Sequence, residues 1–155
     1  MARVSSSVHE RQTADGAAYD DMIRAVEGAE VWIGIASALD PESEIVQYAS
    51  KNEFGSPAER VPERSFMRST ADAQTRKFGR LAAQALKARN RVAFVRGLDL
   101  LGVTAVGDVQ LTIARSVPPP NAASTIAAKG TSTTLIDSGR MRGSIKHETI
   151  PGDER

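Results

Sequence analysis

One carboxylate stands in a sequence pattern that could do chemistry. Near the C-terminus the chain reads Leu135-Ile136-Asp137-Ser138-Gly139, so two apolar residues lead into an acid, a hydroxyl and a glycine. When two such carboxylates meet across two subunits they share one proton, and the pair can then activate a water molecule. Asp137 is therefore the first residue to consider as a catalytic group.

These five residues resemble the active-site signature of the retroviral-type aspartic proteases. Such an enzyme needs a long β-rich segment after the signature, whereas only residues 140–155 follow here and the rest of the chain is predicted to be mostly helical. In the alternative interpretation Asp137 or Ser138 caps a turn of helix, and Leu135 and Ile136 anchor the segment to the core. A capsid-maturation protease using Asp137 remains the enzyme hypothesis.

Other groups that could carry chemistry are sparse. His9 and His147 are the only histidines and lie at opposite ends of the sequence without an acidic motif beside them, so neither predicts a metal site or a general base. The lack of cysteine excludes disulfides, thiolate nucleophiles and thiolate metal sites. Neither common glycine-rich phosphate-binding motif occurs. We therefore expect no cofactor and no metal.

The composition is typical of one soluble globular domain. The chain has 155 residues, of which 41% are hydrophobic and 25% are charged. A net charge of +1 gives no general attraction to nucleic acid or to an anionic membrane, and an aromatic content of 5% is too low for a base-stacking surface. The apolar stretches are too short to span a bilayer or to form a signal peptide, so we expect synthesis in the cytosol.

The first part of the chain predicts a helix, a strand and a long irregular segment. Apolar residues at helical spacing predict a helix over 15–27, which ends near Gly28. The alternation in VWIGI predicts a strand over 31–35, and we expect the helix to pack face to face on it. Residues 36–65 are predicted to be irregular, apart from a short helix around 45–51.

The second part is predicted to be mainly helical. A long helix is expected from about Ser65, and the apolar run at 91–95 is either its tail or a strand. A further helix should follow Gly97, although Gly102 and Gly107 each destabilise it by roughly 1 kcal/mol relative to alanine.

The triple-proline segment 116–134 is predicted to be extended, as an arm or a clamp, with Asn121 capping a short helix over 122–129. The closing residues, 144–150, are expected to form a half-exposed strand.

Together these elements predict an α+β fold, in which a small antiparallel sheet packs against two or three helices and carries long extended loops. We expect a flexible N-terminal arm over 1–13, a single domain over 14–150 that contains the loops 36–65 and 116–134, and a C-terminal tail over 151–155. No repeat of twenty or more residues is present, which excludes a solenoid.

Two stretches, 52–70 and 134–145, have residue patterns that are more specific than a soluble domain requires. Their order and their residues resemble those of the tail-completion and neck proteins of tailed bacteriophages of the Mu-like and lambda-like types. Those proteins carry "YA..(H/N)EFG....IPARPFLR" after a "VGI" strand and close with "PLIDTGRLRNSI" before a last strand. This chain has WIGIAS, YASKNEFG, VPERSFMRST and LIDSGRMRGSI in the same order.

The resemblance covers roughly residues 30–146 and departs from the family pattern at three positions. Asn52 replaces a common histidine, and Ser65 and Thr134 replace common prolines. None of these changes removes a catalytic group, because the family is not catalytic.

The resemblance implies a structural virion protein that completes the tail and joins it to the head. It would form a homo-oligomeric ring around the DNA channel, with a hexamer expected and twelve copies left open. The implied partners are other copies of the chain, the tail tube protein, the portal-side connector proteins and the sheath of a contractile tail. Genomic DNA would pass without specific binding, and no membrane is involved. The implied location is the virion neck, after assembly in the host cytoplasm.

Two neighbouring roles stay open beside tail completion. One is a head-side connector, acting as a stopper or an adaptor. The other is a protein of the channel that contacts DNA, for which strong salt dependence of binding would be the signature.

The resemblance also assigns roles to residues in the two stretches. Long loops that fold only against a neighbour would suit a ring subunit. Phe54 and Phe66 would anchor the first loop or join the chain's own core, Gly55 would permit a tight turn, and Pro62 would fix the approach to the helix. Arg64 and Arg68 would pair with acids on a neighbour. The assembly candidates are Asn52, Glu53, Phe54, Gly55, Pro62, Arg64, Phe66, Arg68, Leu135, Ile136, Asp137, Ser138, Gly139, Arg140 and Met141.

In the second stretch Ile136, Asp137 and Arg140 would dock and cap the last turn. Arg64 and Arg140 are left open between a solvent-exposed position and a place in an interface.

Overall fold

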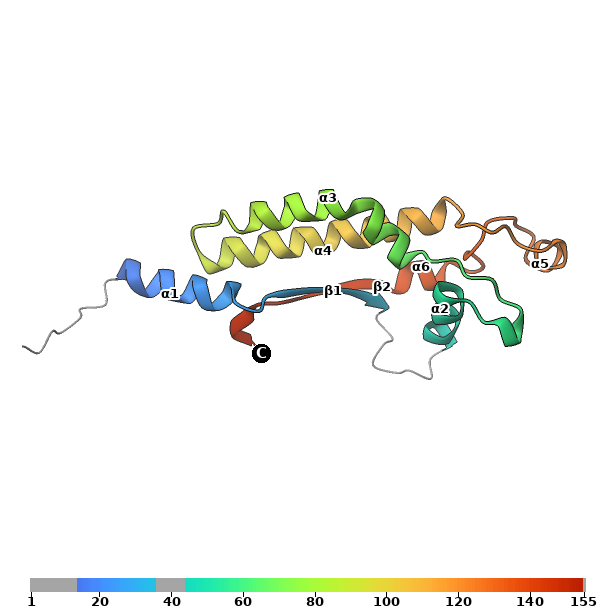
Figure 1. Ribbon diagram of the computed structural model, residues 1–155, viewed down its shortest axis with the longest axis horizontal. Coiled ribbons are helices and arrows are strands. Elements are labelled where there is room, and N and C mark those ends of the chain that lie inside the picture. Colours follow the sequence, from blue (N-terminus) through green and yellow to red (C-terminus); the bar gives the residue numbers. More distant parts are fainter. Residues whose placement is uncertain (1–13, 36–43, 155) are drawn as a thin grey trace, which may run out of the picture.

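The computed structural model describes residues 14–35 and 44–154, and it confirms the predicted α+β fold. The predicted arm, 1–13, and the first part of the irregular segment, 36–43, lie outside the described residues. The molecule is elongated, and a pair of long helices lies along one face of a two-stranded sheet (Figure 1).

The sheet is formed by β1 (Glu30–Ile35) and β2 (Ile145–Ile150). The strands are antiparallel, with Ile35 opposite Ile145 at one end and Glu30 opposite Ile150 at the other. The inner face of β1 packs against the helices as the alternation predicts. Trp32 lies on the opposite face, 61% exposed, and pairs across the sheet with Glu148.

The helices α3 (Met67–Ala85) and α4 (Arg91–Ala114) form an antiparallel hairpin, in which α4 contacts both strands and α3 packs on α4. The side chain of Asn90 caps α4 by accepting a hydrogen bond from the amide of Ala93 at 2.9 Å. The apolar run at 91–95 is therefore the start of α4. The predicted helix start after Gly97 is wrong, because α4 runs through that glycine without a break.

Gly97 and Gly102 allow α4 to approach its neighbours closely. A Cβ atom added to Gly97 would lie 2.7 Å from Cβ of Ala85, and one added to Gly102 would lie 2.2 Å from the ring of His147. Both distances are far below normal van der Waals contact. These glycines cost helix propensity, but they permit the packing of α4 against α3 and β2.

Replacing Gly97 by alanine should therefore destabilise the fold, although alanine is the better helix former. We expect a net loss of about 1–2 kcal/mol, because the overpacking cost exceeds the gain in propensity. The matched control is Gly79→Ala in α3, where nothing lies within 4 Å of the added Cβ, and it should gain up to about 1 kcal/mol. Urea unfolding of both variants measures the difference. Equal effects of the two changes would contradict the close approach at Gly97.

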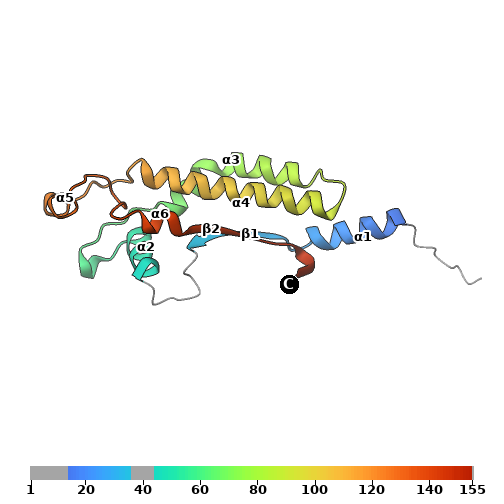
Figure 2. The same ribbon diagram turned by 180° about the vertical axis from the view of Figure 1, so that it is seen from behind.

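The first helix, α1, spans Ala14–Val26 and is followed by a turn in which Gly28 adopts the left-handed conformation with φ +76°. It contacts α4 and η3 (Gly152–Glu154), and it projects beyond the end of the sheet (Figure 2). The expected face-to-face packing of this helix on β1 is therefore wrong. The predicted C-terminal tail contains η3, whose two acids form ion pairs with Arg91.

The core consists of two clusters along the length of α4. One lies near α1 and contains Ala25, Ala85, Phe94 and Leu98. The other contains Ala49, Phe66, Val109, Ile113, Val117, Leu135, Met141 and Ile145. The second cluster contains Leu135, and Ile136 packs against it, as predicted from their apolar character.

Candidate assembly site

The two motif stretches lie at the same end of the molecule. The first begins in α2 (Glu44–Phe54), passes through η2 (Pro57–Glu59) and enters α3. The second begins a few residues after α5 (Ala123–Lys129) and passes through α6 (Arg140–Ser144) into β2. Figure 1 shows α2, α5 and α6 gathered at the end of the hairpin opposite α1. Residues 52–54, predicted to be loop, instead complete α2.

The buried carboxylate of Glu53 caps the N-terminus of α3 from a different helix. It accepts hydrogen bonds from the amides of Phe66, Met67 and Arg68 at 2.8 to 3.0 Å, and from the hydroxyl of Ser65 at 2.9 Å. These amides have no partner inside α3, and the helix dipole favours a negative charge at this position. The hydrogen bonds fix α2 against α3.

The hydrogen bonds also determine the protonation of Glu53. Burial by itself raises the pKa of this carboxyl group, because it penalises the charged form. The three backbone amides and the Ser65 hydroxyl stabilise the carboxylate by more than burial costs, so the pKa lies below its ordinary value. Glu53 is therefore held as an anion.

Arg64 is buried and binds the proline-rich segment. Its Nε donates to the carbonyl of Pro119 at 2.8 Å, and a terminal nitrogen donates to the carbonyl of Pro120 at 3.2 Å. The Arg64 amide also donates to the carbonyl of Asn52 at 2.6 Å. The expectation that Arg64 lies in solvent or in an interface is wrong, because its guanidinium group holds two parts of its own chain together.

Arg68 also finds its partners within the chain. Its guanidinium group forms ion pairs with Glu63 at 2.7 Å and with Glu53 at 3.4 Å, and it lies 5.4 Å from the ring centre of Phe54. The acids expected on a neighbour are thus supplied by the same subunit.

The two phenylalanines of the first motif occupy opposite environments. Phe66 is 1% exposed in the core, whereas Phe54 is 65% exposed. Gly55 makes the predicted tight turn with φ +75°, and Pro62 is exposed in the loop that follows. Asn52 is buried, and its side chain donates to the carbonyl of Tyr48 at 2.8 Å. Phe54 is therefore the large side chain of this motif that a partner could contact.

The second motif is anchored by apolar residues rather than by its acid. Leu135 is buried in a left-handed conformation with φ 61°, and Met141 is also buried. Asp137 and Ser138 are exposed. The predicted helix forms as α6, and the Ser138 hydroxyl accepts a hydrogen bond of 3.5 Å from the amide of Arg140, although Gly139 occupies the N-cap position. Asp137 does not take the N-cap position that was predicted for it. Arg140, the first residue of α6, is exposed.

The proline-rich segment 116–134 is fastened to the same body. The buried Thr134 hydroxyl donates to the carbonyl of Val117 at 2.8 Å. The side chain of Asn121 donates to the carbonyl of Thr133 at 3.2 Å, and Ala122 takes the N-cap of α5, so the predicted capping by Asn121 is wrong. The described parts of the two long loops thus satisfy many of their polar groups within one subunit. The argument that these loops need a neighbour in order to fold is overturned.

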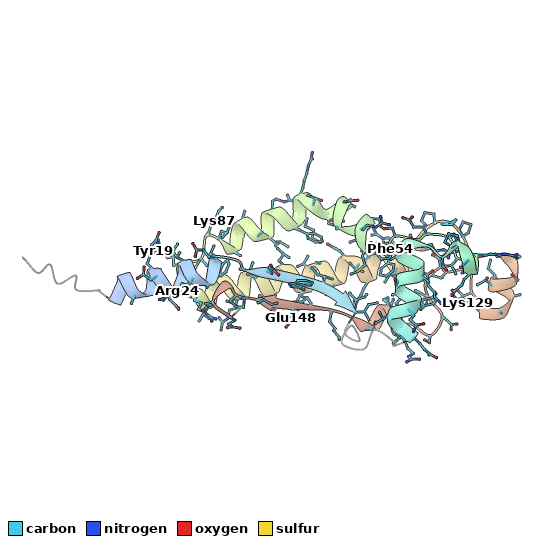
Figure 3. The ribbon with its side chains drawn as sticks, turned by 60° about the horizontal axis from the view of Figure 1, so that its bottom comes forward. Tyr19, Arg24, Phe54, Lys87, Lys129 and Glu148 are labelled. Atoms are coloured by element: carbon cyan, nitrogen blue, oxygen red, sulfur yellow. The ribbon has the colours of Figure 1, made fainter. Side chains whose placement is uncertain are left out.

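The two motifs enclose a cleft of about 1250 Å³. It is lined by α2, by residues 55–64, by the segment from Pro120 to Lys129, and by Leu135 and Asp137. Figure 3 shows Phe54 and Lys129 at this end of the molecule. The cleft brings residues of both motifs together, so it is the candidate contact site.

Tyr48 and Asp137 are ionisable residues in the lining of the cleft. Burial raises the pKa of the Tyr48 hydroxyl, Arg64 lowers it and Asp137 raises it, so the phenol keeps its proton at neutral pH. The carboxylate of Asp137 accepts no hydrogen bond from any described residue. His147 lies away from the cleft and its ring contacts Asp99 at 2.7 Å. Among residues 14–35 and 44–154, no group of three or more His, Cys, Asp or Glu side chains could hold a metal ion.

Comparisons with protein-family models, with curated proteins and with solved structures find no match to this chain. Within the described part of the chain, the helices are too short or too polar to cross a membrane.

Two kinds of residue were missed by sequence reasoning. The capping roles of Glu53 and Asn90 depend on which helix ends meet, and only the Asn90 cap has a local signal, an asparagine just before an apolar run. The exposed positions of Trp32 and Tyr48 were also missed. Trp32 lies on the face of the sheet away from α4, and Tyr48 lines the open cleft.

Proposed function

We propose that this chain is a structural virion protein of a tailed phage, which completes the tail and joins it to the head as a ring of identical subunits. The location in the phage neck comes from the sequence resemblance. The structural support is one observation: large apolar side chains are exposed at separate places along an elongated subunit. Tyr19, Trp32 and Phe54 are aromatic residues among them, and Tyr, Trp and Phe are enriched in protein interfaces relative to the rest of the surface.

These side chains lie on different parts of the molecule. Tyr19 lies near one end and Phe54 near the other (Figure 3). Trp32 lies between them, on the outer face of the sheet opposite Glu148. A ring subunit needs two different surfaces, one for each neighbour, and each contact commonly covers about 800 Å² per partner. The separated positions of Tyr19, Trp32 and Phe54 are compatible with two such surfaces.

The direct test uses the phage that encodes the chain. Antibody labelling should place the protein at the neck of the virion, and deletion should yield filled heads and tails that do not join. A Phe54→Glu variant should fold normally but complement the deletion poorly, because a charge would enter the proposed contact at the cleft. Thr75→Glu, which introduces the same charge at an exposed position of α3 outside the lining of the cleft, is the control and should complement fully. Normal virions after deletion, or labelling on another part of the virion, would refute the proposal.

A further inference from the structure

The helix α4 carries a second apolar stripe that no part of residues 14–35 and 44–154 covers. Its buried side faces α3 and the sheet. On the opposite side the side chains of Val92, Leu100, Val103 and Leu111 are 45–57% exposed. Arg96 and Gly107 complete this stripe, and we call these six residues the α4 seam. A single exposed leucine is ordinary, but a continuous stripe along one helix is typical of a contact surface.

The spacing of the α4 seam matches the packing of one helix on another. Successive seam residues are four, four, three, four and four positions apart, which places all six on one side of the α-helix. Because α4 is apolar on nearly all sides, the seam is not the polar outer face that a surface helix normally presents. The natural occupant is therefore another helix with the same spacing.

The α4 seam is complementary to itself when two copies run antiparallel. In the register centred between Leu100 and Val103, these two residues lie opposite each other across the two copies. Val92 then lies opposite Leu111, and Arg96 lies opposite Gly107. The order of spacings is the same from either end, so every apolar seam residue meets an apolar one.

Size and charge favour the same arrangement. Gly107 has open space where a side chain would be, and it can accommodate the long side chain of Arg96 from the other copy. Arg96 makes no hydrogen bond or ion pair within the described residues, and it is the only charged member of the seam. A parallel pair would place Arg96 against its own counterpart, which like-charge repulsion opposes. The antiparallel pair separates the two arginines.

We infer that the free protein forms a two-fold dimer through antiparallel pairing of the α4 seam with that of a second copy. The inference does not rest on the proposed virion role, because a cyclic ring uses two different surfaces whereas this contact uses one surface twice. Pairing of these helices alone covers less than the roughly 800 Å² per partner of a standard interface. The dimer should therefore dissociate on dilution through the micromolar range.

The first test compares equally exposed apolar positions on two faces. Analytical ultracentrifugation of the full chain should show a monomer–dimer equilibrium, and Val103→Glu should raise its dissociation constant at least tenfold. Leu86→Glu at the end of α3 introduces the same charge at a side chain that is 56% exposed and outside the seam, so it is the matched control and should leave the dissociation constant within twofold. Circular dichroism should show that both variants stay folded. A monomer at all concentrations, or equal weakening by both variants, would overturn the inference.

The second test determines the register by cysteine cross-linking. The chain has no cysteine of its own, so only the introduced thiols can react. Arg96→Cys and Gly107→Cys are purified separately, mixed, and treated with a short bis-maleimide. The mixture should give a cross-linked dimer at least fivefold more efficiently than either variant alone, since only unlike positions face each other. Stronger cross-linking of Arg96→Cys alone would indicate a parallel pair and would refute the proposed register. No enrichment in the mixture would show that another surface, such as α1 of a second copy, covers the seam.

Discussion

Phe66→Ala should lower the free energy of unfolding by about 3–5 kcal/mol, the largest effect we expect from a single truncation in this chain. Phe66 is among the most deeply buried large side chains and belongs to the cluster formed by α2, α4, α6 and β2. Its removal leaves a cavity that helices on several sides cannot close together. Urea denaturation monitored by circular dichroism gives the value.

The matched control is Phe54→Ala, which removes the same side chain from the same motif. Phe54 is mostly exposed, and its ring lies against the Arg68 guanidinium group. We therefore expect the free energy of unfolding to fall by no more than about 1 kcal/mol. A loss at Phe54 equal to that at Phe66 would mean that the isolated protein buries Phe54, and it would remove this side chain from the candidate contact surface.

Glu53→Gln should be the next most damaging change, with a loss of about 2–4 kcal/mol. The amide keeps the size of the side chain but removes the charge, and its NH₂ group would face backbone N–H donors at the start of α3. Glu63→Gln is the control, because Glu63 is exposed and its ion pair with Arg68 should contribute at most about 1 kcal/mol. Thermal or urea unfolding at pH 7 compares the two.

The pH dependence separates the charge of Glu53 from its shape. The folded-state pKa of Glu53 lies below the ordinary glutamate value of about 4.3, so its stabilising contribution is complete above that pH and is lost as the pH falls through the folded-state pKa. The difference in unfolding free energy between the wild type and Glu53→Gln should therefore be constant above about pH 5 and shrink at lower pH. A difference independent of pH down to pH 2 would show that the carboxylate charge does not stabilise the cap.

The charged residues of the first motif do not support assembly in the way that the sequence predicted. Arg64 and Arg68 were expected to reach neighbouring subunits, but both bind groups of their own chain. The first motif instead builds an end piece in which α2, the start of α3 and the proline-rich segment are held together. The case for the proposed ring therefore rests on exposed aromatic side chains such as Phe54 and Trp32.

The sequence alone determined the elements whose signals are local and repetitive. The apolar spacing of α3 and the alternation of both strands indicate which side is buried, because helices and strands have fixed periods. The spacing also predicted α1 as a helix, but Tyr19 and Ile23 of its predicted apolar face are exposed. The α+β class followed from the order of these elements. The buried positions of Leu135 and Ile136 followed from their apolar side chains.

Only the tertiary structure decided the features that depend on which distant groups meet. Glu53 becomes a cap because the end of α2 lies at the start of α3, and Gly97 is required because Ala85 lies against it. Arg64 is buried because two proline carbonyls, more than fifty residues away, replace the water around its guanidinium group. Hydrogen-bond partners and close approaches are set by the meeting of chain segments far apart in sequence, which no local period encodes.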